Sequence, residues 1–266
     1  MNPSEYETMY RVEERYWWYR GMRRIARRAA PGLFRLAAGE RLLDVGCGTG
    51  ANLADMAPPG GDVRGVGLDL SFEGLRFCRR RNLSRLVLGN AEELPFRSGV
   101  FSGVSCRDVL GHVVDDARAL CEIARVARSG APVYLTVAAL RAFAGDQDAA
   151  THVLRRYSAQ DLRRKAEAAG LSAGRSGYAN FFISPAIFAV RRLRALLLPK
   201  REPAVVRSEF HLAPGLLNAP LTALLCFEAE LLGLIRFPFG ASALFYGFKR
   251  WDKIPLAHMN HSLTRS

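Results

Sequence analysis

The sequence of 266 residues predicts an α/β protein with a Rossmann-like, doubly wound and mostly parallel sheet of seven strands. Two observations support this fold class. Short apolar runs alternate with longer amphipathic runs over residues 40–172, and the first apolar run ends in a glycine-rich turn at residues 43–50. The length suits one large α/β domain. An N-terminal helical lid and a helical insertion before the last strand complete the predicted fold.

The periodicity places the elements in order. Strands are expected at 41–46, 63–70, 85–89, 100–107 and 132–138, and helices at 51–57, 71–81, 115–128 and 159–169. Ser71 and Ser158 are expected to cap two of these helices, and Gly170 ends the last one. The less regular remainder predicts strands at 171–180 and 241–250, with helices at 187–198 and 221–235 between them.

Four parts follow from this pattern. Residues 1–39 form an N-terminal helical cap, 40–180 the Rossmann-like core, 181–240 a helical insertion, and 241–266 the last strand with a C-terminal tail. The helices of the insertion fall short of the roughly 20 uninterrupted apolar residues of a membrane span. Arg191, Arg192 and Arg194 interrupt the first, and Glu228 and Glu230 the second. We therefore expect a helical layer over the sheet and no transmembrane segment.

The composition narrows the classes of partner. The net charge is +13, but the basic clusters lack the interleaved aromatic residues of a nucleic-acid motif, so no nucleic-acid partner is expected. Attraction to an anionic membrane surface or to an acidic substrate stays open. The five cysteines are odd in number and form no C-x-x-C pair, which argues against a zinc site and a disulfide framework and favours a reducing cytoplasm. No metal is predicted.

The strongest local signal is the segment LDVGCGTG at residues 43–50. Closely spaced glycines let a backbone turn sharply and let a ligand approach without Cβ collisions, and the N-terminus of the following helix favours an anion. Asp44 could bind a cationic group or orient the loop. However, Gly46, Gly48 and Ala51 also satisfy the dinucleotide pattern G-x-G-x-x-[GA]. Asp69 suits the ribose of NAD as well as that of another nucleoside cofactor, so an NAD-dependent enzyme stays open here.

A third segment favours a cofactor other than NAD. LGNAEELPF at residues 88–96 resembles the "G-D-A-x-x-L-P-F" segment of class I S-adenosylmethionine-dependent methyltransferases, with Asn90 in place of the usual Asp. The oxygen of an Asn side chain can still accept from an adenine amino group. RDVLGHVVDD at 107–116 resembles the family's "D-V-L-E-H-x-x-D-D", and 119–128 its "A-L-x-E-x-x-R-V-L". The turn usually written "K-P-G-G" is degraded at 128–131.

Three further segments resemble one bacterial, methyltransferase type 11-like subgroup. WWYRGMRR at 17–24 is similar to its "W-W-F-R-G-R-R". Asp148 together with 152–162 is similar to its "D-x-x-x-x-H-x-R-R-Y-S-x-x-x-L", and 237–242 also match. The resemblance therefore extends over nearly the whole chain.

This resemblance implies an enzyme that uses S-adenosylmethionine as its cofactor. The residues expected to bind it are Asp44, Gly46, Cys47, Gly48, Gly50, Asp69, Leu70, Asn90, Ala91, Glu92 and Arg107. The candidates for work at the methyl group are His112, His152 and Tyr157. A helix-capping role for His112 and a structural clamp by His152 and Tyr157 are the alternatives, and Asp108 could orient His112 or line the pocket.

The acceptor is predicted to be a small, hydrophobic and lipid-like molecule. The insertion is rich in aromatic residues that could wall such a pocket, namely Phe181, Phe182, Phe188, Phe210, Phe227 and Phe237. Peripheral membrane contact, and a monomer or a homodimer built on the insertion, both stay open. Trp17 and Trp18 could form part of a lid over the cofactor or of the core.

Three other functions are weighed against this one. An NAD-dependent oxidoreductase predicts a Tyr-x-x-x-Lys pair, but Tyr157 is followed four residues later by Asp161. An RNA or protein methyltransferase predicts an N-P-P-Y-like motif after the fourth strand, where Cys106-Arg107-Asp108-Val109 stands. A non-catalytic partner of the same fold is favoured only by Asn90 and the degraded turn.

Overall fold

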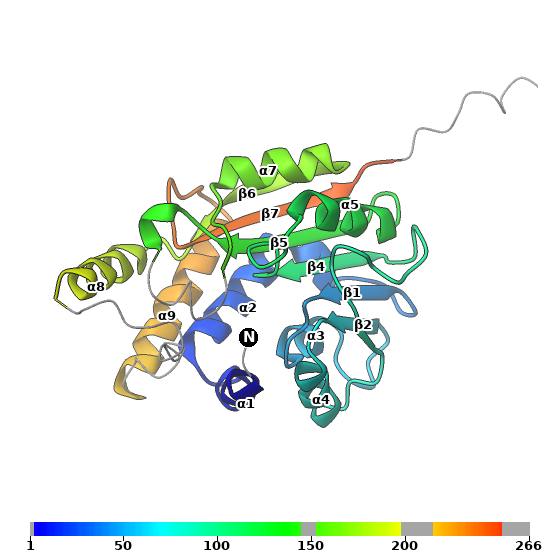
Figure 1. Ribbon diagram of the computed structural model, residues 1–266, viewed down its shortest axis with the longest axis horizontal. Coiled ribbons are helices and arrows are strands. Elements are labelled where there is room, and N and C mark those ends of the chain that lie inside the picture. The colour runs from blue at the N-terminus through cyan, green and yellow to red at the C-terminus, as the bar shows by residue number, and fades with distance from the viewer. Residues whose placement is uncertain (1–2, 145–152, 198–214, 252–266) are drawn as a thin grey trace, which may run out of the picture.

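The computed structural model describes residues 3–144, 153–197 and 215–251. Its sheet has seven strands in the order β3-β2-β1-β4-β5-β7-β6 (Figure 1). The strands are β1 Arg41–Val45, β2 Arg64–Asp69, β3 Leu86–Leu88, β4 Gly103–Arg107, β5 Pro132–Ala138, β6 Leu171–Ala179 and β7 Ser242–Lys249. The first five pair in parallel, whereas β7 runs antiparallel to both β5 and β6. The predicted seven-stranded, mostly parallel sheet is therefore confirmed.

Helices cover both faces of this sheet (Figure 1). Leu43 and Val45 of β1 point into a core shared with α5 (Asp116–Val126) and α7 (Ala159–Ala168). Leu42 points into a second core with α2 (Trp17–Ala29), α3 (Ala51–Met56), α4 (Phe72–Arg80) and α9 (Gly215–Leu232). Burial on both faces explains why the inner strands read as almost continuous apolar runs.

The capping signals correctly located two helices. The Ser71 side chain accepts a hydrogen bond from the Gly74 N–H at 3.2 Å, and the Ser158 side chain accepts one from the Asp161 N–H at 3.0 Å. The remaining short elements are α1 (Pro3–Val12), α8 (Ser184–Leu197) and two 3₁₀ helices, η1 (Pro31–Phe34) and η2 (Arg141–Phe143). Along the chain, α1 contacts α4, and α2 packs against α9.

Helix α9 differs from the expected 221–235. It begins at Gly215 and includes Pro220, whose lack of an N–H removes only one bond near the start of the helix. By length and composition alone, α9 is apolar enough to cross a membrane, and 28% of it is buried within the protein. Its Glu228 is fully buried, and the carboxylate accepts hydrogen bonds from the backbone N–H groups of Asn180 and Phe182. These bonds attach α9 to the end of β6.

The strand order places the functional loops. It reverses between β1 and β4, and open α/β sheets bind their ligands at the carboxyl ends of the strands beside such a reversal. The loops after β1 and β4 touch at their bases, because a Cβ on Gly46 would lie 2.1 Å from Val109 Cγ2. The loops after β1, β2 and β4 therefore meet at one edge of the sheet.

Candidate functional site

The glycine loop that follows β1 adopts a conformation that requires glycine. Gly46 and Gly48 have φ values of +71° and +55°, in the left-handed region. The loop turns back on β2, since the N–H groups of Gly46 and Cys47 both donate to the Leu68 carbonyl, at 2.7 and 3.0 Å. Any side chain at Gly46 would collide with Val109. The loop thus places the half-buried backbone of Gly46 and Gly48 at the carboxyl end of β1, and its binding of a cofactor stays a prediction.

Asp69, the last residue of β2, lies directly against this loop. One of its carboxylate oxygens accepts from the Gly48 N–H at 2.7 Å, and the other from the Ser71 N–H at 2.8 Å. Burial raises the pKa of this carboxyl, and these backbone hydrogen bonds oppose the change. The next residue, Leu70, is 75% exposed. A buried carboxylate therefore stands beside an apolar surface that faces outward.

The loop after β3 carries three further predicted residues. The Asn90 side-chain oxygen accepts from the Glu92 N–H at 3.0 Å, which closes a local turn, and Ala91 is buried in the core. Glu92 Oε1 accepts from the N–H groups of Val114 and Asp115, at 2.7 and 3.1 Å. Glu92 therefore ties this loop to the loop that follows β4.

Arg107 lies beside Asp44. Its guanidinium donates to Asn52 Oδ1 at 3.0 Å and to Ser105 Oγ at 3.1 Å. Burial raises the pKa of Asp44 to about 6, and the positive charge of Arg107 limits that rise. Arg107 thus stands as a counter-ion to Asp44 on the sheet face that α3 covers. Its binding to the cofactor stays a prediction.

Asp108 and His112 occupy the loop after β4. Asp108 has a φ of +56°, which is uncommon for a residue with a side chain and frequent at functional sites. Desolvation raises the pKa of its carboxyl, and the neighbouring His112 opposes this. His112 follows within a turn in which its N–H donates to the Val109 carbonyl at 2.8 Å. The structure thus brings these two titratable side chains to the same loop.

Tyr157 holds that loop from the side. Its hydroxyl oxygen lies 2.7 Å from Asp116 Oδ2 and 2.9 Å from the Leu110 carbonyl oxygen. The Leu154 N–H donates to the Gly111 carbonyl at 2.8 Å, so the segment binds the loop at two points. Tyr157 therefore supports this loop through its hydroxyl, and a catalytic role for it stays a prediction. His152 and Asp148 lie outside the described residues.

Helix α1 covers the glycine loop, and the sequence did not reveal the contacts that hold it there. The Met9 methyl lies 3.0 Å from where a Gly48 Cβ would stand. The hydroxyl of Thr49 donates to the carboxylate of Glu13, directly after α1. Arg81 donates to the same carboxylate at 2.8 Å and to the Thr49 carbonyl at 3.0 Å. A run of ordinary charges and polar residues gives no signal for such a link.

The aromatic residues expected to wall an acceptor pocket contact one another instead. Phe181 stacks on Phe237 with ring centroids 4.9 Å apart, and Phe182 lies 6.0 Å from Phe227. Phe188 meets Phe143 edge-on, and Phe210 lies outside the described residues.

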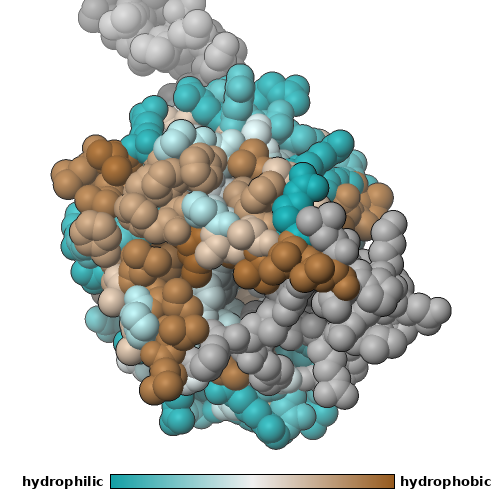
Figure 2. Space-filling model, turned by 90° about the vertical axis from the view of Figure 1, so that its left-hand side faces the viewer, coloured by the Kyte–Doolittle hydropathy of each residue, from teal (hydrophilic) through white to brown (hydrophobic). Residues whose placement is uncertain are grey.

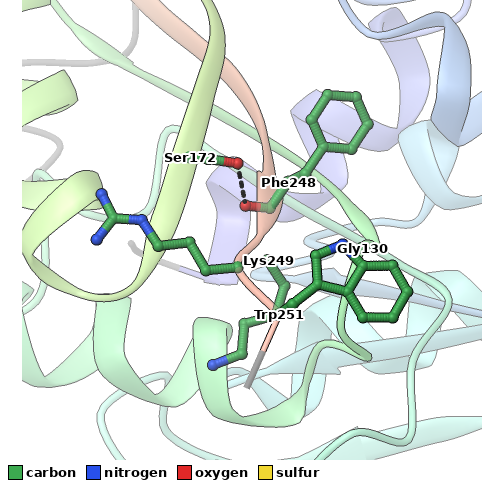
Figure 3. Close-up of a pocket in the computed structure, with 6 residues that line it drawn as sticks. Gly130, Ser172, Phe248, Lys249 and Trp251 are labelled. Atoms are coloured by element: carbon green, nitrogen blue, oxygen red, sulfur yellow. Dashed lines mark hydrogen bonds between the residues drawn. The ribbon is translucent and has the colours of Figure 1, made fainter. Parts of the chain in front are cut away.

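A surface pocket of about 520 Å³ lies at the opposite end of the sheet (Figure 3). Gly130, Ser172 and Trp251 are among its lining residues, and the Ser172 hydroxyl donates to the Phe248 carbonyl there at 3.1 Å. Gly130 precedes β5, so this pocket is at the end where the parallel strands begin. The glycine loop and Asp69 are at the other end, where α/β sheets bind ligands.

Known proteins share this sequence pattern and architecture. Residues 43–135 match the family model of a methyltransferase domain. The demethylmenaquinone methyltransferase of Symbiobacterium thermophilum is 39% identical over 100 residues, 35% of this chain and 40% of that protein. The ubiquinone biosynthesis O-methyltransferase of Ralstonia nicotianae is 33% identical over 105 residues, 37% of this chain and 43% of that protein. The matches thus span about two fifths of each relative's length.

Solved structures show the same fold over more of the chain. The structure of the complex between the Trm112 methyltransferase activator of Haloferax volcanii and a methyltransferase aligns with a TM-score of 0.61 and 19% identity, covering 95% of this chain and 96% of that one. A phosphoethanolamine N-methyltransferase of Haemonchus contortus in complex with S-adenosylmethionine aligns with a TM-score of 0.56 and 17% identity, covering 88% of this chain and 53% of that one. At these identities the likeness concerns the fold.

Proposed function

We propose that the chain is a class I S-adenosylmethionine-dependent methyltransferase that transfers the methyl group of S-adenosylmethionine to a small apolar acceptor; the methyltransferase family model over residues 43–135 supports this. The observation that carries this proposal is the 2.7 Å contact between the Gly48 N–H and the Asp69 carboxylate. It unites the loop after β1 with the carboxylate that ends β2, at the reversal of strand order.

The residues of this edge suit the proposed cofactor. Gly46 and Gly48 form a backbone cradle in which a Cβ would collide with Val109 or Met9. Asp69 keeps lone pairs on both carboxylate oxygens for ribose hydroxyls, because each accepts one backbone bond. Exposed Leu70 offers an apolar surface to the nucleoside. S-adenosylmethionine supplies a sulfonium methyl group, which is already electrophilic.

The chain itself would position the acceptor, exclude water and supply a base. Holding an acceptor in line is the main contribution that such a reaction needs. His112 is our candidate to take the proton of an acceptor hydroxyl, with Asp108 beside it. Tyr157 would act as a positioning residue through the Leu110 carbonyl. The relatives named for menaquinone and ubiquinone methylation support a small apolar acceptor.

Calorimetric titration with S-adenosylhomocysteine, with NAD as a parallel control, tests the proposal. We expect micromolar binding of the first, on the order of what enzymes show for such ligands, and none of NAD. Asp69→Asn should weaken binding about tenfold, because a charged acceptor becomes neutral. The exposed Asp62→Asn serves as the matched control and should bind as the wild type does. NAD binding, or a folded protein that binds neither, would contradict the proposal.

The role of His112 has its own test. His112→Ala should bind S-adenosylhomocysteine normally but lose about 10² or more of the transfer rate, as expected when a general base is removed. The assay measures methyl transfer to a panel of hydroxylated aromatic and lipid-like acceptors. Full activity of this variant would make the histidine structural.

A further inference from the structure

Helix α9 is apolar on the side that faces away from the protein. Leu216, Pro220, Ala223 and Phe227 recur every three or four residues, and all four are exposed, Leu216 by 92% and Phe227 by 56%. Its inward side is also apolar and contains Leu225, which is fully buried. A surface helix normally has polar residues on its outer side. The outer side of α9 is therefore suited to an apolar environment.

Helix α8 repeats this arrangement. Val190, Leu193 and Leu197 follow one another at spacings of three and four, and all are exposed, Leu197 by 69%. On its inner side, Ile187 packs in one cluster with Leu225 of α9. The ring centroid of Phe182, just before α8, lies 6.0 Å from that of Phe227 in α9. The two helices thus belong to one surface.

We call this surface the α8–α9 face and define it by Phe182, Val190, Leu193, Leu197, Leu216 and Phe227. Figure 2 shows the side of the molecule on which α8 and α9 lie, with apolar side chains gathered over much of it. Single exposed apolar residues are ordinary, whereas such a gathering marks an interaction site.

The charged residues of α8 are all basic. Helix α8 contains three arginines and no acidic residue. Arg192 is exposed, and its guanidinium lies 5.3 Å from the centre of the Phe188 ring. Of the two glutamates of α9, Glu228 is fully buried and Glu230 pairs with Arg24 and Arg28. The net charge of the whole chain is +13.

We propose that the α8–α9 face binds the surface of an anionic lipid bilayer. Outward Leu and Phe side chains would enter the boundary between headgroups and acyl chains, and the exposed Arg192 of α8 would lie at a lipid phosphate. A second copy of the chain fits this surface less well. A symmetric interface would bring the arginines of both copies together without an acidic partner among the described residues of the face. This inference does not depend on methyl transfer.

Co-sedimentation of the full chain with lipid vesicles tests the proposal. We expect binding to vesicles of phosphatidylcholine with phosphatidylglycerol, weaker binding to phosphatidylcholine alone, and loss of binding as salt is raised. Leu193→Glu and Phe227→Glu should each lower the partition coefficient about tenfold, because a side chain that would enter the bilayer changes from apolar to charged. Arg192→Gln should weaken binding only to the anionic vesicles.

Matched controls separate the face from general effects. Trp251→Glu changes an exposed aromatic residue at the opposite end of the sheet, and Arg164→Gln removes an exposed arginine from α7. Both should bind vesicles as the wild type does, and circular dichroism should show that every variant is folded.

Three outcomes would overturn the proposal. They are a protein that stays in solution with anionic vesicles, equal binding to both lipid compositions, and variants that bind unchanged. Light scattering identifies the other occupant: a dimer that Phe227→Glu dissociates, without vesicle binding, would assign the face to a second copy.

Discussion

At the end of β1, the Asp44 carboxyl is almost completely buried, and this burial raises its pKa from 3.8 to about 6 despite the nearby charge of Arg107. The folded protein therefore binds more protons than the unfolded chain between these two pH values. Stability falls as the pH rises through that window, because the charged form is the disfavoured one in the fold. The difference corresponds to about 3 kcal/mol at pH 7.

Replacing Asp44 by Asn removes this titration while keeping the shape. The unfolding free energy of Asp44→Asn should exceed that of the wild type by up to about 3 kcal/mol at pH 7, with little difference near pH 4. Urea unfolding at a series of pH values measures both curves. Asp62→Asn, on the surface, should follow the wild type. Parallel curves for Asp44→Asn and wild type would show that this carboxyl does not titrate abnormally.

Tyr157 is buried, and its hydroxyl contacts Asp116 and the Leu110 carbonyl. Tyr157→Phe removes the hydroxyl between Asp116 and the Leu110 carbonyl, so we expect a loss of about 1–2 kcal/mol of unfolding free energy. The loop that carries His112 loses a support, so the transfer rate should fall while the pH dependence of the rate keeps its shape. A displaced pH profile would instead assign the proton transfer to Tyr157.

The matched control for that variant is Tyr178→Phe. The Tyr178 hydroxyl accepts from the Ala159 N–H at 3.1 Å, away from the His112 loop. It should lose stability without slowing transfer. Chemical denaturation and initial-rate measurements on both variants separate the two effects.

At the scale of elements, both polar and aromatic contacts attach α1 to the glycine loop and α4. The Glu13 carboxylate is buried, and burial raises its pKa while Thr49 and Arg81 lower it. Tyr10 of α1 also contacts Phe77 of α4, with ring centroids 4.9 Å apart. A helix of ten residues has little stability of its own, so its position depends on these contacts.

Arg81→Met should therefore loosen α1. It leaves the buried Glu13 carboxylate without its cation, which costs about 3 kcal/mol when a buried pair is broken from one side. Hydrogen exchange should become faster in α1 than in β1, and thermal unfolding should occur at a lower temperature. Arg80→Met is the control, since Arg80 is exposed and directly precedes Arg81 at the end of α4. Unchanged exchange in α1 would mean that apolar contacts alone hold this helix.

Over the whole molecule, the sequence predicted the sheet better than the site. Alternation of apolar runs located all seven strands, because the inner strands are buried on both faces and their ends are marked by glycine, proline or polar residues. The glycine loop and Asp69 could be predicted because backbone turning and cofactor chemistry both restrict residue type. The link from Glu13 through Thr49 to Arg81 could not, because it joins segments 30 to 70 residues apart through common side chains.

Helix α9 shows a second reason why sequence prediction falls short. The sequence pattern predicts a helix at 221–235, yet α9 begins earlier, at Gly215, and ends at Leu232. Asn218 near its start accepts from the Trp17 N–H at 2.7 Å and donates to the Arg15 carbonyl at 2.9 Å. Such contacts between distant segments override local preference.

A small molecule could bind at either end of the sheet. Binding at one end or the other would protect different residues from amide exchange. S-adenosylhomocysteine should slow amide exchange at residues 46–50 and 69–71, where the loops after β1 and β2 meet, and leave Gly130 and Ser172 unchanged at the pocket of the opposite end. At a concentration 100 times its dissociation constant, the ligand should stabilise the whole fold by about 2.7 kcal/mol. At the same ligand concentration, Asp69→Asn with its roughly tenfold weaker binding should keep only about 1.4 kcal/mol of this stabilisation, whereas Trp251→Glu should keep all of it. Protection at Gly130 and Ser172 instead would place the cofactor site at the wrong end of the sheet for this family and would contradict the assignment of the glycine loop.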